Sequence, residues 1–138
     1  MWGAVSPYPG AGMSAHDISP AVRQLIAEGI DSIAELEGVL LLREHRDRDW
    51  TAEDAGARLY VSVAVASHVL SVLAARGFLA ESAGRYRYAP ETPDIEEAVS
   101  ALAVCYPKNL IAVTQLVHAK PAQSVRQFAR AFRLRKDG

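Results

Sequence analysis

The chain has 138 residues, of which half are apolar, and its fifteen Lys and Arg against sixteen Asp and Glu leave a net charge of −1. This length and composition suit one domain whose core needs neither disulfides nor metals. The charge balance excludes a strongly basic nucleic-acid coat protein and an acidic disordered tail. Cys105 is the only cysteine, so an intramolecular disulfide is excluded and a reducing compartment is expected.

The sequence also predicts where the protein resides. The longest apolar runs are far shorter than the roughly 20 residues that span a bilayer. The opening MWGAVSPYPGAG lacks the basic and apolar regions of a signal peptide. We therefore expect a soluble, cytoplasmic protein without a membrane partner. Residues 1–19, which are rich in Gly, Pro, Ser and Ala, are expected to form a flexible lead-in.

Two helices are predicted after the lead-in. Ser19-Pro20 is a typical helix start, and the helix that follows is expected to end at Gly29. Ser32 and Glu35 have the spacing of a capping box, in which each side chain binds the other residue's backbone amide. The second helix is followed by a predicted solvated loop over residues 46–49.

A pair of helices joined by a tight bend comes next. Thr51 and Asp54 form a second capping box at the start of a short helix, and Tyr60-Val61 makes the bend. Ser62 then caps a longer helix over residues 63–76. Small and apolar side chains at helical spacing are expected to pack where the two helices cross: Ala55, Ala66, Val69, Leu70 and Leu73.

A hairpin is predicted directly after this pair. Gly77 is placed for a left-handed helix cap, and two β-prone segments follow over residues 78–81 and 86–88. Residues 82–85 are short enough to join them as a compact hairpin.

Residues 91–138 are predicted to be helical, with Pro107 kinking or breaking the first stretch. The last helix, residues 124–134, carries a basic stripe of Arg126, Arg130 and Arg133, which we expect to be the solvated face of a docked helix. Contact with DNA phosphates, an anionic membrane or an acidic partner is the alternative. The predicted C-terminal helices carry more apolar surface than a small domain needs to cover its core. This surplus makes the region a candidate for homodimerisation. The apolar residues are Leu110, Ile111, Val113, Leu116, Val117, Phe128 and Phe132.

The predicted elements follow the order of a winged helix-turn-helix domain: a helix, a short helix, a bend, a longer helix and a hairpin. The passage from Leu70 to Leu79, LSVLAARGFL, resembles the segment that leaves the recognition helix in the MarR family and in many other winged-helix transcription regulators. The resemblance covers residues 32–90. It implies a mainly α fold with a small β-hairpin wing and additional N- and C-terminal helices. We therefore expect a winged helix-turn-helix domain over residues 20–90 and a candidate dimerisation region over 91–138.

The resemblance implies a DNA-binding transcription regulator that acts as a dimer on double-stranded DNA. Arg85 and Arg87 alternate with Tyr86 and Tyr88, so the arginines share one face of the hairpin and the tyrosines share the other. The arginines would contact phosphates flanking the site. The residues expected at the major groove are Ser62, Ala64, Ser67, His68 and Ser71.

A protein-interaction module with the same fold is the alternative. The outer face of helix 63–76 has no Arg, Lys, Asn or Gln, the residue types that make paired contacts to guanine or adenine. Val65 and Val72 flank His68, and an apolar flank is more natural against a protein than in a DNA groove. A net charge near zero favours this alternative as well.

No pattern typical of an enzyme is present. The four histidines are widely separated, and none has a His or Cys neighbour at metal-ligand spacing. A P-loop, a GxSxG elbow and an HExxH motif are all absent. We therefore expect no catalysis, no metal and no cofactor. Cys105 is expected to be a small core residue rather than a redox sensor.

Overall fold

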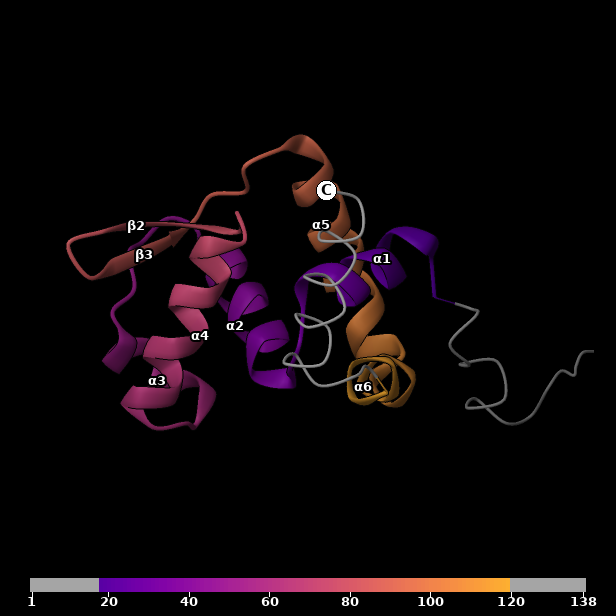
Figure 1. Cartoon of the computed structure of the whole chain (residues 1–138), viewed down its shortest axis with the longest axis horizontal. Coiled ribbons are helices and arrows are strands. Elements are labelled where there is room, and N and C mark those ends of the chain that lie inside the picture. The colour runs from indigo at the N-terminus through magenta and orange to yellow at the C-terminus, as the bar shows by residue number, and fades with distance from the viewer. Residues whose placement is uncertain (1–17, 120–138) are drawn as a thin grey trace, which may run out of the picture.

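The computed structural model describes residues 18–119, which form six helices and one hairpin (Figure 1). This confirms a mainly helical chain with a small antiparallel hairpin. The predicted basic helix over residues 124–134 lies outside the described residues, as does all of the predicted lead-in except Ile18 and Ser19. The elements are α1 (Pro20–Gly29), α2 (Ile33–Glu44), α3 (Ala52–Leu59), α4 (Val63–Ala75), β2 (Leu79–Ser82), β3 (Arg85–Tyr88), α5 (Pro93–Lys108) and α6 (Leu110–His118).

Side-chain caps set where several helices begin. The Ser19 hydroxyl accepts from the amide of Val22, and the Ser62 hydroxyl accepts from Val65 at 3.1 Å. Thr51 and Asp54 make both bonds of a capping box, at 3.1 and 3.3 Å. These bonds satisfy amides that the first helical turn would otherwise leave unpaired. The three predicted helix starts are therefore confirmed.

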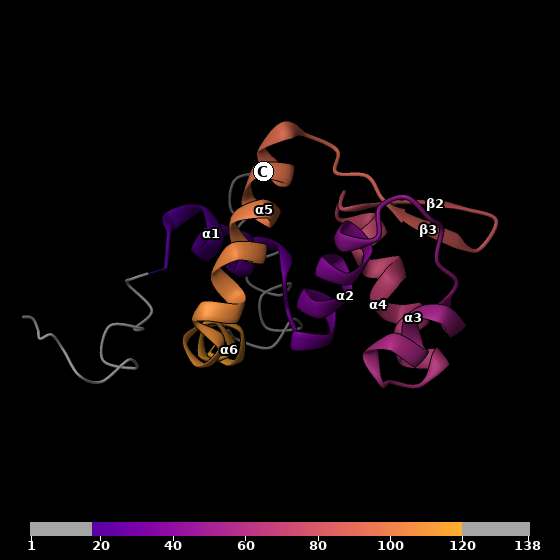
Figure 2. The same ribbon diagram turned by 180° about the vertical axis from the view of Figure 1, so that it is seen from behind.

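Helix α2 is the centre of the molecule. It contacts α3, α4 and β3 on one side and α5 on the other, as the reverse view shows (Figure 2). Its inward side chains Leu36, Val39 and Leu42 are fully buried. Helix α5 packs along α1, and α6 packs against both. Ile18 is also buried in this core, so the prediction that the flexible lead-in extends to residue 19 is wrong at its end.

Helices α3 and α4 cross closely after a three-residue turn, and the bend between them is 108°. Tyr60 makes the turn in the left-handed region, at φ 60°. A Cβ atom at Gly56 would lie 3.0 Å from the Val61 carbonyl oxygen, so a larger residue would force the turn to move. Ala55 and Ala66 are fully buried at the crossing, as predicted. Within residues 18–119 no single helix could span a membrane, and α3 and α4 meet the length and composition criteria only jointly, as this bent pair.

The hairpin is short and closely turned. Strands β2 and β3 pair antiparallel with Leu79 opposite Tyr88, which extends the predicted strands by one residue on each side of the turn. Ala83 and Gly84 both have positive φ, the geometry that two-residue hairpin turns prefer. Gly77, at φ 90°, confirms the predicted left-handed position, and a Cβ there would lie 2.8 Å from Glu91.

Of two local predictions at helix ends, one is confirmed and one is wrong. Pro107 lies in the last turn of α5, which ends at Lys108, and α6 begins at Leu110, so the predicted break before Leu110 is confirmed. The wrong prediction is the capping box at Ser32. Its hydroxyl accepts from Glu35 at 3.1 Å, but the Glu35 carboxylate accepts from the amide of Asp31 instead.

We predict that Leu70→Asp destabilises the fold by at least about 3 kcal/mol, because it places an unpaired charge in the centre of the core. Thermal unfolding followed by circular dichroism measures the effect. Ser67→Asp, an exposed change on the same helix, is the control and should leave the midpoint within a few degrees of the parent. Equal midpoints for the two variants would contradict the assignment of the inner face of α4.

Candidate nucleic-acid interface

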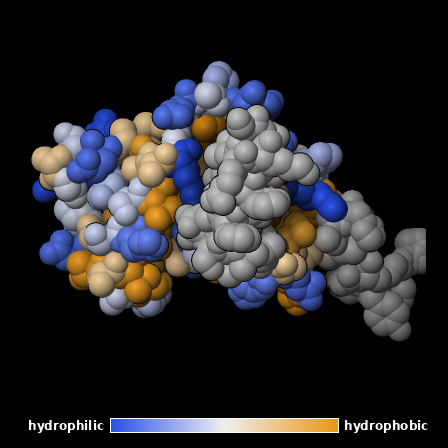
Figure 3. All heavy atoms as spheres, viewed as in Figure 1, coloured by the Kyte–Doolittle hydropathy of each residue, from blue (hydrophilic) through white to orange (hydrophobic). Residues whose placement is uncertain are grey.

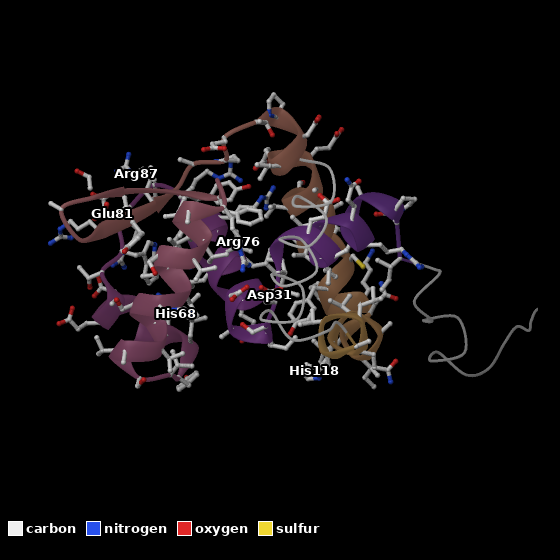
Figure 4. The ribbon with its side chains drawn as sticks, in the orientation of Figure 1. Asp31, His68, Arg76, Glu81, Arg87 and His118 are labelled. Carbon is white, nitrogen blue, oxygen red and sulfur yellow. The ribbon has the colours of Figure 1, made fainter. Side chains whose placement is uncertain are left out.

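Helix α4 is fixed at its C-terminal end by a group of contacts that we call the Arg76 cluster: Arg76, Gly29, Asp31 and Glu35. The Arg76 guanidinium donates to the Gly29 carbonyl at 2.8 Å, to the Glu35 carboxylate at 2.9 Å and to the Asp31 carboxylate at 2.7 Å. Figure 4 shows Arg76 and Asp31 facing one another. The two acidic side chains are only 12% and 8% exposed, so the cluster is largely shielded from water. It ties the end of α4 to the junction of α1 and α2.

The outer face of α4 is presented to solvent. Ser62 caps the helix, so its hydroxyl oxygen already accepts a bond. The Ser71 hydroxyl donates to the backbone carbonyl of His68 at 2.9 Å, so its hydrogen is already engaged while its oxygen can still accept a bond. All five residues expected at a major groove are exposed: Ser62, Ala64, Ser67, His68 and Ser71. Figure 4 labels His68 on α4.

The two hairpin arginines lie on one face, as predicted, but only one of them is free of an ion pair. The Arg87 guanidinium pairs with the Asp49 carboxylate at 2.7 Å. Arg85 is exposed and has no ion-pair partner among residues 18–119. On the opposite face, Tyr86 is half-buried and Tyr88 is buried. The sequence therefore located both arginines correctly but did not indicate the carboxylate that neutralises Arg87.

Trp50 supports the hairpin, which its sequence context did not predict. Its amide donates to the Tyr86 carbonyl at 2.7 Å and its carbonyl accepts from the Tyr86 amide at 2.8 Å, so it adds a bridge beside β3. Its ring is fully buried, and the Arg48 guanidinium lies 4.0 Å from the ring centroid. The sequence did contain one indication of this bridge. Trp50 is an aromatic residue directly before the Thr51 cap, where a third strand could pair with the hairpin.

A second hydrogen-bonded group joins the hairpin to α5. The Tyr88 hydroxyl donates to the Glu96 carboxylate at 2.6 Å, and Arg43 of α2 lies 3.4 Å from the same carboxylate. The bond from Tyr88 holds the pKa of Glu96 below its usual range, and Arg43 contributes in the same direction. Burial, followed by the bond to Glu96, raises the pKa of the Tyr88 hydroxyl. These contacts hold the base of the hairpin against two helices.

Large apolar side chains are exposed in two places within the described residues. One place is the turn between α3 and α4, where hydrophobic spheres gather at the lower left of Figure 3. The other is the end of α5 and the start of α6. At the turn they are Tyr60 (93% exposed), Val63 (49%) and Val65 (44%), and on α5 and α6 they are Val104 (61%), Leu110 (53%) and Ile111 (73%).

The predicted self-association surface is therefore smaller than expected. Val113 and Val117 are buried in the core of this same chain, and Leu116 is half-buried against it, because α6 turns them toward α1 and α5. Phe128 and Phe132 lie outside the described residues. In the alternative protein-binding surface, Val65 is exposed but Val72 is half-buried.

Three comparisons, with protein-family models, curated proteins and solved structures, found no match to this chain. Among residues 18–119, no group of three or more His, Cys, Asp or Glu side chains is placed to hold a metal ion. Cys105 is half-buried at the C-terminal part of α5.

We predict that Tyr88→Phe destabilises the protein by about 1 kcal/mol at neutral pH, the usual cost of losing a hydrogen bond to a partly exposed carboxylate. A carboxylate with a lowered pKa stabilises the fold above its ordinary pKa and loses this contribution as the pH falls. The difference between parent and variant should therefore shrink under acidic conditions. Urea unfolding across the pH range measures this, with Tyr86→Phe as the control. A difference independent of pH would contradict the role of Glu96.

Proposed function

We propose that this chain is a winged helix-turn-helix regulator that binds double-stranded DNA, with α4 as its recognition helix. Helix-turn-helix pairs meet at about 90–120° across a turn of three or four residues. The 108° bend between α3 and α4 and the turn over residues 60–62 fit that geometry. The bridge at Trp50 takes the place of a first wing strand, since it pairs with β3. The exposed polar face of α4 beside the arginine-bearing hairpin is the observation that carries this proposal.

The hairpin supports the proposal through its charge. Arg85 is available to a phosphate, because it has no ion pair within residues 18–119. Arg87 and Asp49 are 54% and 41% exposed. An ion pair in such an exposed setting contributes about 0–1 kcal/mol, so a phosphate oxygen can replace Asp49 at little cost. Both arginines can therefore contact a DNA backbone.

The recognition face limits how selectively the protein reads bases. Serine and histidine make single hydrogen bonds to base edges, whereas strong discrimination uses the paired contacts of Arg, Asn or Gln. Ser71 also has its hydroxyl hydrogen engaged with the backbone of α4. We therefore propose that phosphate contacts and DNA shape supply most of the affinity.

A protein partner is the second candidate, and the apolar turn favours it. Tyr60, Val63 and Val65 are exposed next to the same face of α4. Residues 18–119 carry nine Lys and Arg against fourteen Asp and Glu, a balance that opposes DNA association. In this case the turn between α3 and α4 would be the contact and the hairpin arginines would matter little.

We also propose that the protein forms a homodimer through α5 and α6. Val104, Leu110 and Ile111 are more than half exposed there, and covering them against a second copy would remove apolar surface from water. A dimer would present two copies of α4, the arrangement that two-fold DNA sites require.

We predict that Arg85→Ala combined with Arg87→Ala weakens binding to all duplex sequences alike. The slope of log affinity against log salt concentration should flatten by about one to two units, because each arginine neutralises about one phosphate. Fluorescence anisotropy of labelled duplexes at several salt concentrations measures both effects.

The matched control for this pair is Arg23→Ala with Lys108→Ala, which removes the same charge from α1 and α5. An equal change in slope for the control would contradict a contact at the hairpin. If Val65→Asp instead abolishes capture of a protein partner while the arginine pair has no effect on any binding, the protein-binding alternative replaces the DNA proposal.

We predict that Ile111→Glu raises the dimer dissociation constant at least about tenfold, because burying an isoleucine stabilises an interface by about 1.5–3 kcal/mol. Sedimentation equilibrium of the full chain measures the constant. Gln115→Glu adds the same charge at an exposed position of α6 and is the control. A parent protein that stays monomeric at high concentration would overturn the proposed dimer.

A further inference from the structure

A groove lies between α1, α5 and the residues that follow α4. It has a volume of about 550 Å³ and is separate from the outer face of α4, since Arg76 and Phe78 beyond the C-terminal end of that helix form one wall. Apart from Arg76, the buried and half-buried side chains of its lining are apolar and form its floor, and exposed carboxylates lie along its rim. The floor includes Leu25, Phe78 and Ile95, and the rim carries Glu28, Asp94 and Glu97.

The groove has an unbalanced negative charge. Asp94 and Glu97 have no ion-pair partner within residues 18–119. Glu28 lies in the last turn of α1, where the helix dipole is already negative and no basic residue offsets it. Arg76 is the one cation in the lining, and its guanidinium already donates to Gly29, Asp31 and Glu35. The site therefore favours an occupant that is both apolar and cationic.

The chain itself contains a segment with these properties. Residues 120–138 carry six Lys and Arg and one Asp, whereas residues 18–119 carry five more acidic than basic side chains. Within the segment, apolar residues recur at spacings of three and four, and so do arginines, so a helix would place them on adjacent stripes. The apolar stripe would consist of Val125, Phe128 and Phe132, and the basic stripe of Arg126, Arg130 and Arg133.

The segment is also long enough to reach the groove. It begins directly after α6, which packs against α1, the helix that forms one side of the groove. Helix α5, whose first turn lines the groove, is about 24 Å long at 1.5 Å per residue over sixteen residues. Nineteen residues cover about 60 Å when extended. An extended segment therefore exceeds the length of this helix.

We propose that this groove is the docking site for the chain's own residues 120–138, with the phenylalanines against its floor and the arginines against its carboxylates. A tethered segment has an effective concentration in the millimolar range, so contacts too weak to hold a free peptide can hold it. Docking offsets the charge of the groove and covers its apolar floor.

Chymotrypsin cleavage of the full chain after Phe128 and Phe132, followed by mass spectrometry, tests this docking. Rates are divided by those of synthetic peptides with the same 120–138 sequence, which removes effects of local sequence on the protease. The parent should be protected. Glu28→Lys with Glu97→Lys should raise the cleavage rate about tenfold, because proteolysis follows the population of undocked segment. Asp94 is left unchanged because it also stabilises the first turn of α5.

Two further variants make the test specific. Glu44→Lys with Asp47→Lys makes the same charge change at exposed positions outside the groove lining and should leave protection intact. Arg126→Glu, Arg130→Glu and Arg133→Glu together should abolish protection, and adding the groove pair Glu28→Lys and Glu97→Lys should restore it. Equal cleavage of parent and groove pair would overturn the proposal. Protection that appears only as the protein concentration rises would assign the groove to a second copy and overturn docking within one chain.

Discussion

The Arg76 cluster is the constraint on which the arrangement of this molecule depends. One guanidinium satisfies a helix-terminal carbonyl and two shielded carboxylates, at Gly29, Asp31 and Glu35. Moving α4 away would take the guanidinium from two carboxylates in a poorly hydrated place, which is far more costly than breaking a surface ion pair. The cluster thus fixes the end of α4 and, with the close crossing at Gly56, determines which of its faces points outward.

Other contacts in the molecule also hold the outer face of α4 and the hairpin in place. Helix α2 lies between the α3–α4 pair and α5, so a single core holds both halves (Figure 2). The hairpin is tied to that core twice, through the backbone bridge at Trp50 and through the bond from Tyr88 to Glu96. A rigid base positions the hairpin, while its turn and its two arginines remain exposed. The proposed phosphate contacts beside α4 would use this arrangement.

What the sequence predicted was mostly local. The cap at Ser62 and the left-handed Gly77 follow from interactions within a few residues, so their spacing was sufficient to find them. The role of Glu35 was missed because its arginine partner is 41 residues away. Val117 was assigned to self-association because an apolar stripe does not say which neighbour covers it, and in the fold α6 turns it inward. The bridge at Trp50 required knowing where β3 lies.

The proposal that the outer face of α4 and the hairpin bind DNA is tested most directly by mapping the contact. The full chain, labelled with ¹⁵N, is titrated with a duplex oligonucleotide at low salt, and amide shifts are recorded. We expect shifts at residues 62–71 and 84–87, which fade as salt is added. No shifts at low salt, or shifts confined to α5 and α6, would contradict the account.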